Sequence, residues 1–212
     1  MSRIVYFDCA SGASGDMLLG ALVDLGLPLD ALRSELAKLP VRGHRLESRK
    51  VTRSGLQATK VDVLIDGEQG HAHGHRGLGE VLEILEGSGL EPAVKERASS
   101  LFRRLAEAEA SVHGTTPEEV RFHEVGAVDS IVDIVGGVLG LAWLRADRFV
   151  ASPLNVGTGT VTMSHGTFSV PPPATARLVQ GVPVYGAGDG ELLTPTGALL
   201  VTGHASDRKS VV

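Results

Sequence analysis

Three histidines on alternate residues form the densest group of metal-binding side chains in the sequence. They are His71, His73 and His75, in a polar, glycine-rich stretch at about 67–77 that shows no hydrophobic periodicity. Neutral imidazole is a common ligand for nickel, copper, zinc and cobalt, and a mobile loop lets several rings close on one ion. Because short His-rich stretches are also ordinary solvated loops, the spacing alone leaves both interpretations open.

A second group of candidate ligands lies where an almost wholly apolar segment begins. Asp129 and Asp133 are four residues apart, so they share one face of a helix predicted over about 129–144. Two carboxylates on a buried helix repel one another unless a cation or hydrogen bonds hold them. His123 and Glu124, just before the helix, could add a nitrogen and an oxygen ligand. The alternative makes Asp129 the helix N-cap and Asp133 the cap of a nearby group.

A third group is a turn of small residues that follows the first predicted strand. The turn contains Asp8, Ser11, Gly12, Ser14, Gly15 and Asp16. Between a strand and a helix N-terminus, such a turn presents backbone N–H groups to an anion and suits a phosphate. It lacks the lysine of a P-loop and the three-glycine spacing of a dinucleotide-binding turn. The alternative is a plain helix start, with Ser14 as the N-cap.

The remaining candidates lie at a helix end and in later turns. His113 could join the second group, although a histidine in the last turn before Gly114 is also favoured by the helix dipole. Backbone donors and hydroxyls also occur in the turns at 155–159, 164–166 and 194–197, of which the first supplies Asn155, Gly157 and Gly159. Singly, each of these is most often only a turn.

Helices and strands alternate along the chain, which predicts an α/β (mixed α+β) fold in which a sheet carries several packed helices. The spacing of apolar residues predicts strands at 3–7, in 44–66 around a turn at 54–55, from 148 to 170, and at 182–188. It predicts helices at 17–25, 28–39, from 78, at 92–112 and from 173 to Gly181. The segment 92–112 is the long amphipathic helix, and 129–144 is a buried helix whose glycines predict close packing. The residues at 116–119 match a capping box, which predicts one more helix start.

Composition narrows the function further. The chain has 212 residues, a formal net charge of −5 and 4% aromatic residues, which argues against nucleic-acid binding. Cys9 is the single cysteine, so no internal disulfide can form and a reducing, cytoplasmic compartment is expected. The longest apolar stretch, 131–144, contains Asp133 and is shorter than the roughly 20 residues needed to span a bilayer. No signal peptide is expected at the N-terminus.

Taken together, these stretches resemble the LarC family, whose members insert nickel during synthesis of the nickel-pincer cofactor. The resembling segments are DCASGASGDMLLGAL at 8–22, HAHGH at 71–75, LAEAEASVHG at 105–114, FHEVGAVDSIVDIVG at 122–136, SPLNVGTGTV at 152–161, SHGTFSVPPPAT at 164–175 and ELLTPTGALL at 191–200. They cover nearly the whole chain, which is treated as a single domain over residues 1–212. The resemblance implies that family members continue with a further domain of similar size, which is associated with CTP binding and is not expected within these 212 residues.

The resemblance implies that nickel is inserted into pyridinium-3,5-bisthiocarboxylic acid mononucleotide with formation of Ni–C and Ni–S bonds. The reaction in this family consumes CTP, is assisted by Mn²⁺ or Mg²⁺, and serves lactate racemase and related enzymes. The C-terminal domain, or a separate chain that carries it, is then an expected partner, and a homo-oligomer is possible.

The roles expected of the residues follow from this chemistry. The loop histidines His71, His73 and His75 capture Ni²⁺, and a second cation site comprises His113, His123, Glu124, Asp129 and Asp133. The cofactor precursor is expected to contact Ser11, Gly12, Ser14, Gly15, Asn155, Gly157 and Gly159. Acid–base work is assigned to Asp8, Asp16, Glu124 and Asp129, since a carboxylate can accept the ring proton lost as the Ni–C bond forms. Two rival functions are a nickel store or chaperone and a metal-dependent phosphohydrolase that uses Asp129 and Asp133.

Overall fold

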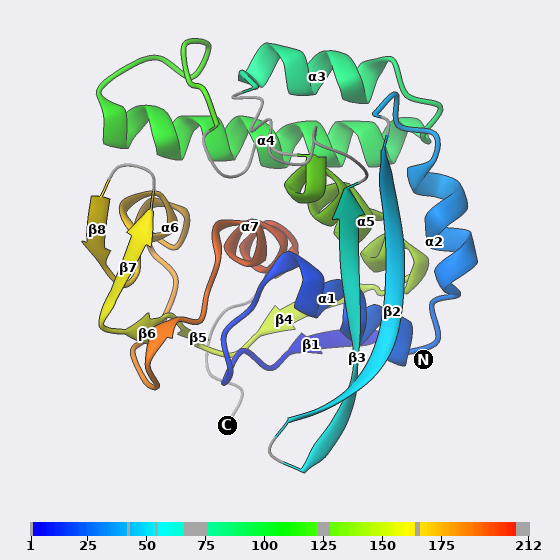
Figure 1. Cartoon of the computed structure of the whole chain (residues 1–212), viewed down its shortest axis with the longest axis horizontal. Helices are drawn as coiled ribbons and strands as arrows, with labels where there is room; N and C mark the ends of the chain where they lie inside the picture. The colour runs from blue at the N-terminus through cyan, green and yellow to red at the C-terminus, as the bar shows by residue number, and fades with distance from the viewer. Residues whose placement is uncertain are drawn as a thin grey trace.

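The computed structural model describes residues 2–41, 43–53, 55–65, 76–122, 128–163 and 166–206, and it has the mixed α/β architecture that the sequence predicts. The helices are α1 (Gly15–Asp24), α2 (Leu29–Leu36), α3 (Leu78–Glu86), α4 (Pro92–His113), α5 (Val128–Trp143), α6 (Pro173–Leu178) and α7 (Pro195–His204). Figure 1 shows α3 and α4 along one side and β1 with β4 along the other, with α1, α5 and α7 between them.

Three of these helices, α1, α5 and α7, pack side by side and run in the same direction. Residues of α1 meet residues of α5 in ascending order: Gly15 with Asp133, Leu19 with Gly136, and Leu22 with Gly140. Helix α7 joins them in the same sense, because Thr196 near its start bonds to Gly15 and Leu200 one turn later packs on Gly137. The predicted close packing of the glycines in α5 is therefore confirmed, and all three helices begin at one end of the molecule.

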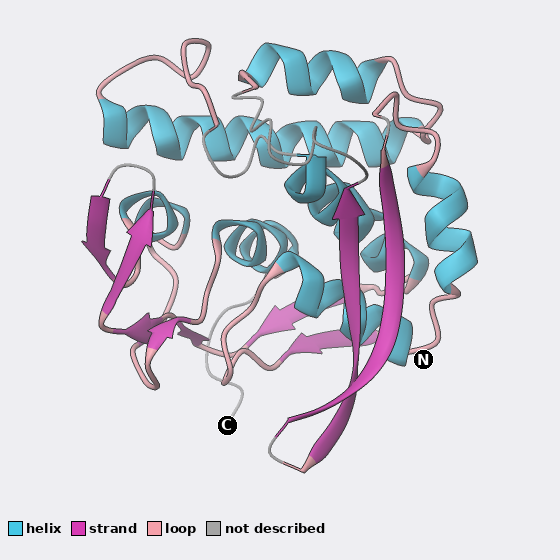
Figure 2. Ribbon diagram, in the orientation of Figure 1, coloured by secondary structure: helices cyan, strands magenta, loops and turns pink. Residues whose placement is uncertain are grey.

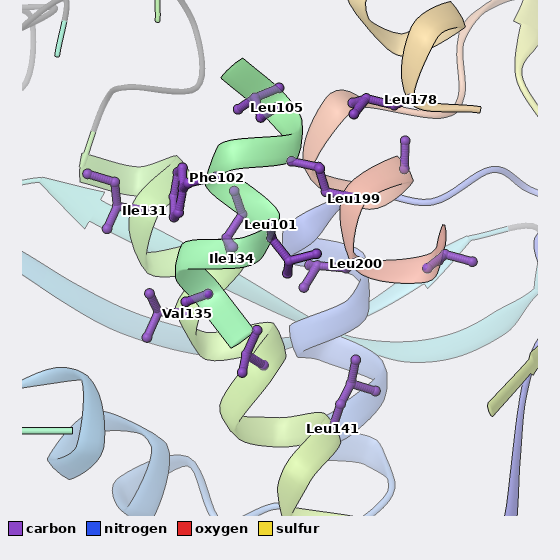
Figure 3. Packing of buried hydrophobic residues seen from close by; sticks show 14 of the residues in the cluster. Leu101, Phe102, Leu105, Ile131, Ile134, Val135, Leu141, Leu178, Leu199 and Leu200 are labelled. Atoms are coloured by element: carbon purple, nitrogen blue, oxygen red, sulfur yellow. The ribbon is translucent and has the colours of Figure 1, made fainter. Parts of the chain in front are cut away.

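The long helix α4 covers this group with the apolar face that its sequence predicts. Leu101, Phe102 and Leu105 are almost completely buried, and Figure 3 shows them beside Ile134 of α5 and Leu199 of α7. Helix α4 ends at Gly114, which adopts a left-handed conformation with φ of 68° and so closes the helix as a glycine C-cap does.

The strands form small pairs, not one continuous sheet. Among the described residues there are five two-stranded sheets, which Figure 2 shows around the helices. Strand β1 (Ile4–Phe7) pairs in parallel with β4 (Arg148–Ala151), and β2 (His44–Arg53) pairs with β3 (Leu56–Ile65) as a long hairpin. The others are β5 (Leu154–Asn155) with β9 (Val184–Tyr185), β6 (Gly157–Thr158) with β10 (Gly190–Glu191), and β7 (Thr160–Met163) with β8 (Gly166–Ser169).

Two local predictions are wrong. The capping box at 116–119 forms, since the Glu119 carboxylate accepts a hydrogen bond from the Thr116 N–H at 3.3 Å, but the chain makes only a turn there. No helix follows because Val120 is buried and Arg121 pairs with Gly77 in a β-bridge. The strand predicted at 182–188 shrinks to Val184–Tyr185. In the described part of the chain, no helix combines the length and apolar character that crossing a membrane requires.

Candidate functional site

The shared N-terminal end of α1, α5 and α7 gathers the carboxylates that the sequence analysis singled out. Asp16 lies in the first turn of α1 and Asp129 in the first turn of α5, and Asp133 lies one turn further along α5. A helix N-terminus carries about half a positive charge and stabilises acidic side chains in its first turn. Asp16 and Asp129 therefore lie where a helix end favours a negative charge, whereas Asp133 lies beyond the first turn.

Asp133 is the most perturbed of the three. Its Oδ1 atom is buried without a hydrogen-bond partner among the described residues. Burial, followed by the negative charges of Asp16 and Asp129, raises the pKa of Asp133 to about 7. The carboxylate is pressed against the α1 backbone, because a β-carbon added at Gly15 would lie 2.5 Å from Asp133 Oδ2. This carboxyl group therefore exchanges a proton near neutral pH, as an acid–base group needs to do.

The start of α1 is held in place by its own cap and by α7. Ser14 is the N-cap of α1: its hydroxyl accepts a hydrogen bond from the Met17 N–H and also bonds to the Asp16 carboxylate. Thr194 caps α7 in the same way, accepting from the Gly197 N–H at 3.3 Å. The two caps are joined because the Gly15 N–H donates to Thr196 Oγ1 at 3.2 Å. The alternative interpretation of this turn, a plain helix start with Ser14 as the N-cap, is thus confirmed, whereas the sequence does not predict its link to α7.

Replacing Thr196 by alanine should lower the free energy of unfolding by about 1–2 kcal/mol, because the buried Gly15 N–H would lose its acceptor. Thr196→Ser retains the hydroxyl and should lose less than half as much. Urea denaturation followed by circular dichroism measures both. Equal losses in the two variants would show that the threonine methyl group, and not the hydrogen bond, matters.

Asn155 ties the predicted turn at 155–159 to the turn at 8–16. Its Nδ2 donates to Ala10 O at 2.8 Å, and its Oδ1 accepts from the N–H groups of Gly157 and Ala187 at 3.1 and 3.0 Å. The amide is therefore engaged with backbone groups from three segments. Gly157, with φ of 86°, lies against the carbonyl of Gly190, where a β-carbon would come within 2.0 Å.

The turn at 8–16 borders a cavity of about 210 Å³ between β1 and the helices α1, α5 and α7. Its wall includes Asp8, Cys9, Ser14 and Met17 and is otherwise mainly apolar. Burial, and then the charge of Asp8, raises the pKa of the Cys9 thiol to about 11, so this sulfur is a protonated, buried group. Ser11 is exposed, and Gly12 adopts a φ of 79° against the carbonyl of Leu192.

The other predicted ligands lie apart from this end or outside the described residues. His113 ends α4, where its Nε2 lies 3.5 Å from the Glu109 carboxylate one turn back. His71, His73, His75, His123 and Glu124 lie outside the described residues. Within the described part, no three histidine, cysteine, aspartate or glutamate side chains gather closely enough to hold a metal ion. Gly159 has open space around it, with φ of 87°.

The turn at 194–197 is a candidate from the sequence, which does not predict that this turn starts helix α7. A signal was present, because threonine followed by proline is typical of an N-cap and first helical position, and an apolar run follows. The sequence does not reveal that Thr196, two residues after the cap, accepts a hydrogen bond from Gly15, which lies 181 residues away.

Known proteins resemble this chain over nearly its whole length. The model of a family described as nickel insertion protein matches residues 5–211. A relative from Citrifermentans bemidjiense that bears the family's name is 51% identical over 205 residues, covering 96% of this chain and 52% of the relative. Relatives named pyridinium-3,5-bisthiocarboxylic acid mononucleotide nickel insertion protein occur in Desulfitobacterium hafniense and Geobacillus kaustophilus. They are 47% and 45% identical, covering 97% and 94% of this chain and 50% of each relative.

The chain spans about half the length of these relatives. No solved structure matches it.

Proposed function

The chain belongs to the nickel insertion protein family, and on that premise we propose that it takes part in inserting nickel into pyridinium-3,5-bisthiocarboxylic acid mononucleotide. In this reaction Ni²⁺ is a substrate: it bonds to a ring carbon and to the two sulfur atoms, and the ring carbon releases its proton. The protein must therefore deliver the ion, hold the mononucleotide and accept one proton.

The observation that carries the proposal is Asp133, whose Oδ1 is buried without a hydrogen-bond partner among the described residues and whose pKa is raised by burial to about 7. We assign the ring proton to this group, because a general base works best when its pKa lies near the working pH. Of the acid–base groups predicted from sequence, Asp16 and Asp129 act on Asp133 through their charge. Glu124 and Asp8 remain candidates for the same proton.

Mn²⁺ or Mg²⁺ is the second ion in the proposal. Carboxylate oxygens are the ligands that these hard cations prefer, and the unpartnered Asp133 Oδ1 is a buried acceptor available beside two further carboxylates. Asp133 would hold the ion together with the predicted ligands His123 and Glu124, while Asp16 and Asp129 would add negative charge nearby; His113, at the end of α4, would take no part. Its chemistry there would be to neutralise clustered negative charge when substrate binds.

The mononucleotide would bind across the turn at 8–16. The N–H groups of Gly15 and Met17 are already bonded within the protein, so the phosphate of the mononucleotide would be attracted by the positive end of the α1 dipole. The neighbouring cavity has mainly apolar walls. Ligand sites are commonly about 300–1,000 Å³, so the 210 Å³ cavity would take a ring-sized part of the ligand. Ser11, Gly12, Ser14, Gly15, Asn155, Gly157 and Gly159 would shape this surface. The same proposal has four further parts. The reaction consumes CTP, and the CTP-associated domain is a partner. The protein is cytoplasmic, and the product serves lactate racemase.

The nickel-delivery step is tested by changing the three loop histidines together. In His71/His73/His75→Ala, calorimetric titration with Ni²⁺ should show the loss of one binding event, because the imidazole ligands are gone. His44→Ala, at the start of β2, is the control and should keep the titration of the unchanged protein. A triple variant with unaltered stoichiometry and affinity would remove the loop from the mechanism.

A nickel store or chaperone is distinguished from this function by the mononucleotide itself. A protein that only carries nickel should show no heat on titration with the mononucleotide, whereas the proposed function requires saturable binding. Phosphate release from nucleotides with Mn²⁺ and without nickel would instead favour a phosphohydrolase.

A further inference from the structure

A second cavity lies at the opposite end of the parallel helices, where α5 and α7 finish. It measures about 240 Å³ and lies between the first turns of α4, the ends of α5 and α7, and strand β4. Its apolar wall includes Val138, Leu141 and Phe149, and its polar wall consists of Arg97, Arg145 and His204. None of the described residues that line this cavity is acidic. The cavity is therefore positively charged, although the chain as a whole has a formal net charge of −5.

Arg145 is held in an unusual backbone conformation at the end of α5. It has φ of 48°, and no other described residue apart from glycine has positive φ. Glycine is the usual residue in this region, because a β-carbon there costs about 1 kcal/mol. The Arg145 side chain is exposed at the cavity, and no hydrogen bond or ion pair with a described residue engages it. Arg145 thus occupies a position where glycine would be more stable, and such backbone conformations are concentrated at functional sites.

The other two polar residues of the wall, Arg97 and His204, determine how much charge the cavity carries. The Arg97 guanidinium donates to the carbonyl of Gly203 at the end of α7, which uses part of its donor fork. His204 places Nδ1 2.8 Å from the Leu200 carbonyl and its ring edge against Phe149. Burial lowers the pKa of His204 to about 4, so the imidazole is neutral at pH 7.

The charges around this cavity would be balanced by one bound anion. The carbonyl ends of α5 and α7 contribute about half a negative charge each, whereas Arg97 and Arg145 contribute two positive charges. The balance is about one positive charge beside an apolar wall. A guanidinium fork matches the two oxygens of a carboxylate.

We propose that this cavity binds a small organic carboxylate, with its charged group on Arg145 and Arg97 and its apolar body against Leu141 and Phe149. The site is separate from the carboxylate end of α1, α5 and α7 and does not depend on the function proposed for that end.

Benzoate is a suitable probe, with benzamide as the neutral analogue of the same shape. Titration of the unchanged chain, followed by amide shifts in ¹H–¹⁵N spectra, should give saturable benzoate binding with Kd on the order of 1 mM. Shifts should cluster at residues 142–149 and 203–205. Benzamide should bind at least about tenfold more weakly, since it lacks the charge.

Two variants of Arg145 separate binding from folding. Arg145→Gln should weaken benzoate binding by at least about tenfold. Arg145→Gly should do the same while raising the unfolding midpoint, because it relieves the positive φ. Arg177→Gln on α6, an exposed arginine elsewhere, is the matched control and should bind benzoate as the unchanged chain does. Absence of saturation, equal binding of benzamide, or full affinity in both Arg145 variants would overturn the proposal.

Discussion

Replacing Asp133 by asparagine should stabilise the protein at pH 8 and abolish nickel insertion. The pKa of Asp133 is raised from 3.8 to about 7, so the folded state binds this proton more tightly than the unfolded state does. The resulting stability is fully present below pH 4 and is lost as the pH rises to about 7. About three pKa units correspond to at most about 4 kcal/mol. We expect a gain of about 2 kcal/mol at pH 8, because the asparagine amide is itself poorly solvated.

The measurement is a series of urea denaturation curves between pH 4 and pH 8. The unfolding free energies of the variant and the unchanged protein should be close at pH 4 and diverge as the pH rises. Asp129→Asn is the control for charge alone: Asp129 is exposed, so its stability should change by less than about 0.5 kcal/mol. Under the proposed function, nickel insertion is assayed with CTP and the CTP-associated domain supplied, by the absorbance of the product formed from the mononucleotide. A stabilised Asp133→Asn variant with full activity would remove Asp133 from the chemistry.

Replacing Gly197 by alanine should cost about 3 kcal/mol or more and should uncouple α7 from α1. An added β-carbon would lie 2.1 Å from the carbonyl oxygen of Ala13 and 2.7 Å from the N–H nitrogen of Ser14. Both are backbone atoms and cannot rotate away, so one helix must move. That movement would break the hydrogen bond between Gly15 and Thr196, which positions the start of α1.

The control for this variant is another glycine near a helix start. Gly79 of α3 has nothing within 4 Å of an added β-carbon, so Gly79→Ala should stabilise the chain by about 0.5 kcal/mol through helix propensity. Thermal unfolding monitored by circular dichroism compares the two. If Gly197→Ala unfolds at the same temperature as the unchanged protein, the contact between α7 and the turn at 8–16 is looser than described.

The sequence alone predicts most of the elements, since their signals are local. The spacing of apolar residues places α4, and the glycines of α5 predict its close packing. The site is predicted only in part, because its residues come together through contacts between distant segments. Asp129 and Asp133 could be paired by their spacing of four, whereas Asp16 joins them only because α1 and α5 run parallel with their starts together.

Contacts between distant segments also explain which features the sequence does not predict. The threonine-rich start of α7 looks like an isolated turn until its partner at Gly15 is known. The strand pairs were likewise expected to form one sheet, because periodicity identifies strands and carries no information about which strand pairs with which. The capping box at 116–119 is the opposite case. Its local hydrogen bond forms, but no helix follows because Val120 is buried.

The hydrogen bond between Gly15 and Thr196 also affects when, during synthesis of the chain, the start of α1 reaches its final position. These residues are 181 positions apart, so nearly the whole chain must be synthesised before the start of α1 gains its partner. Contacts between such distant segments form slowly, since a long loop must close first. Under the proposed function, a nascent chain would carry His71, His73 and His75 long before α7 fixes the start of α1, and the order of synthesis would separate collecting an ion from using it.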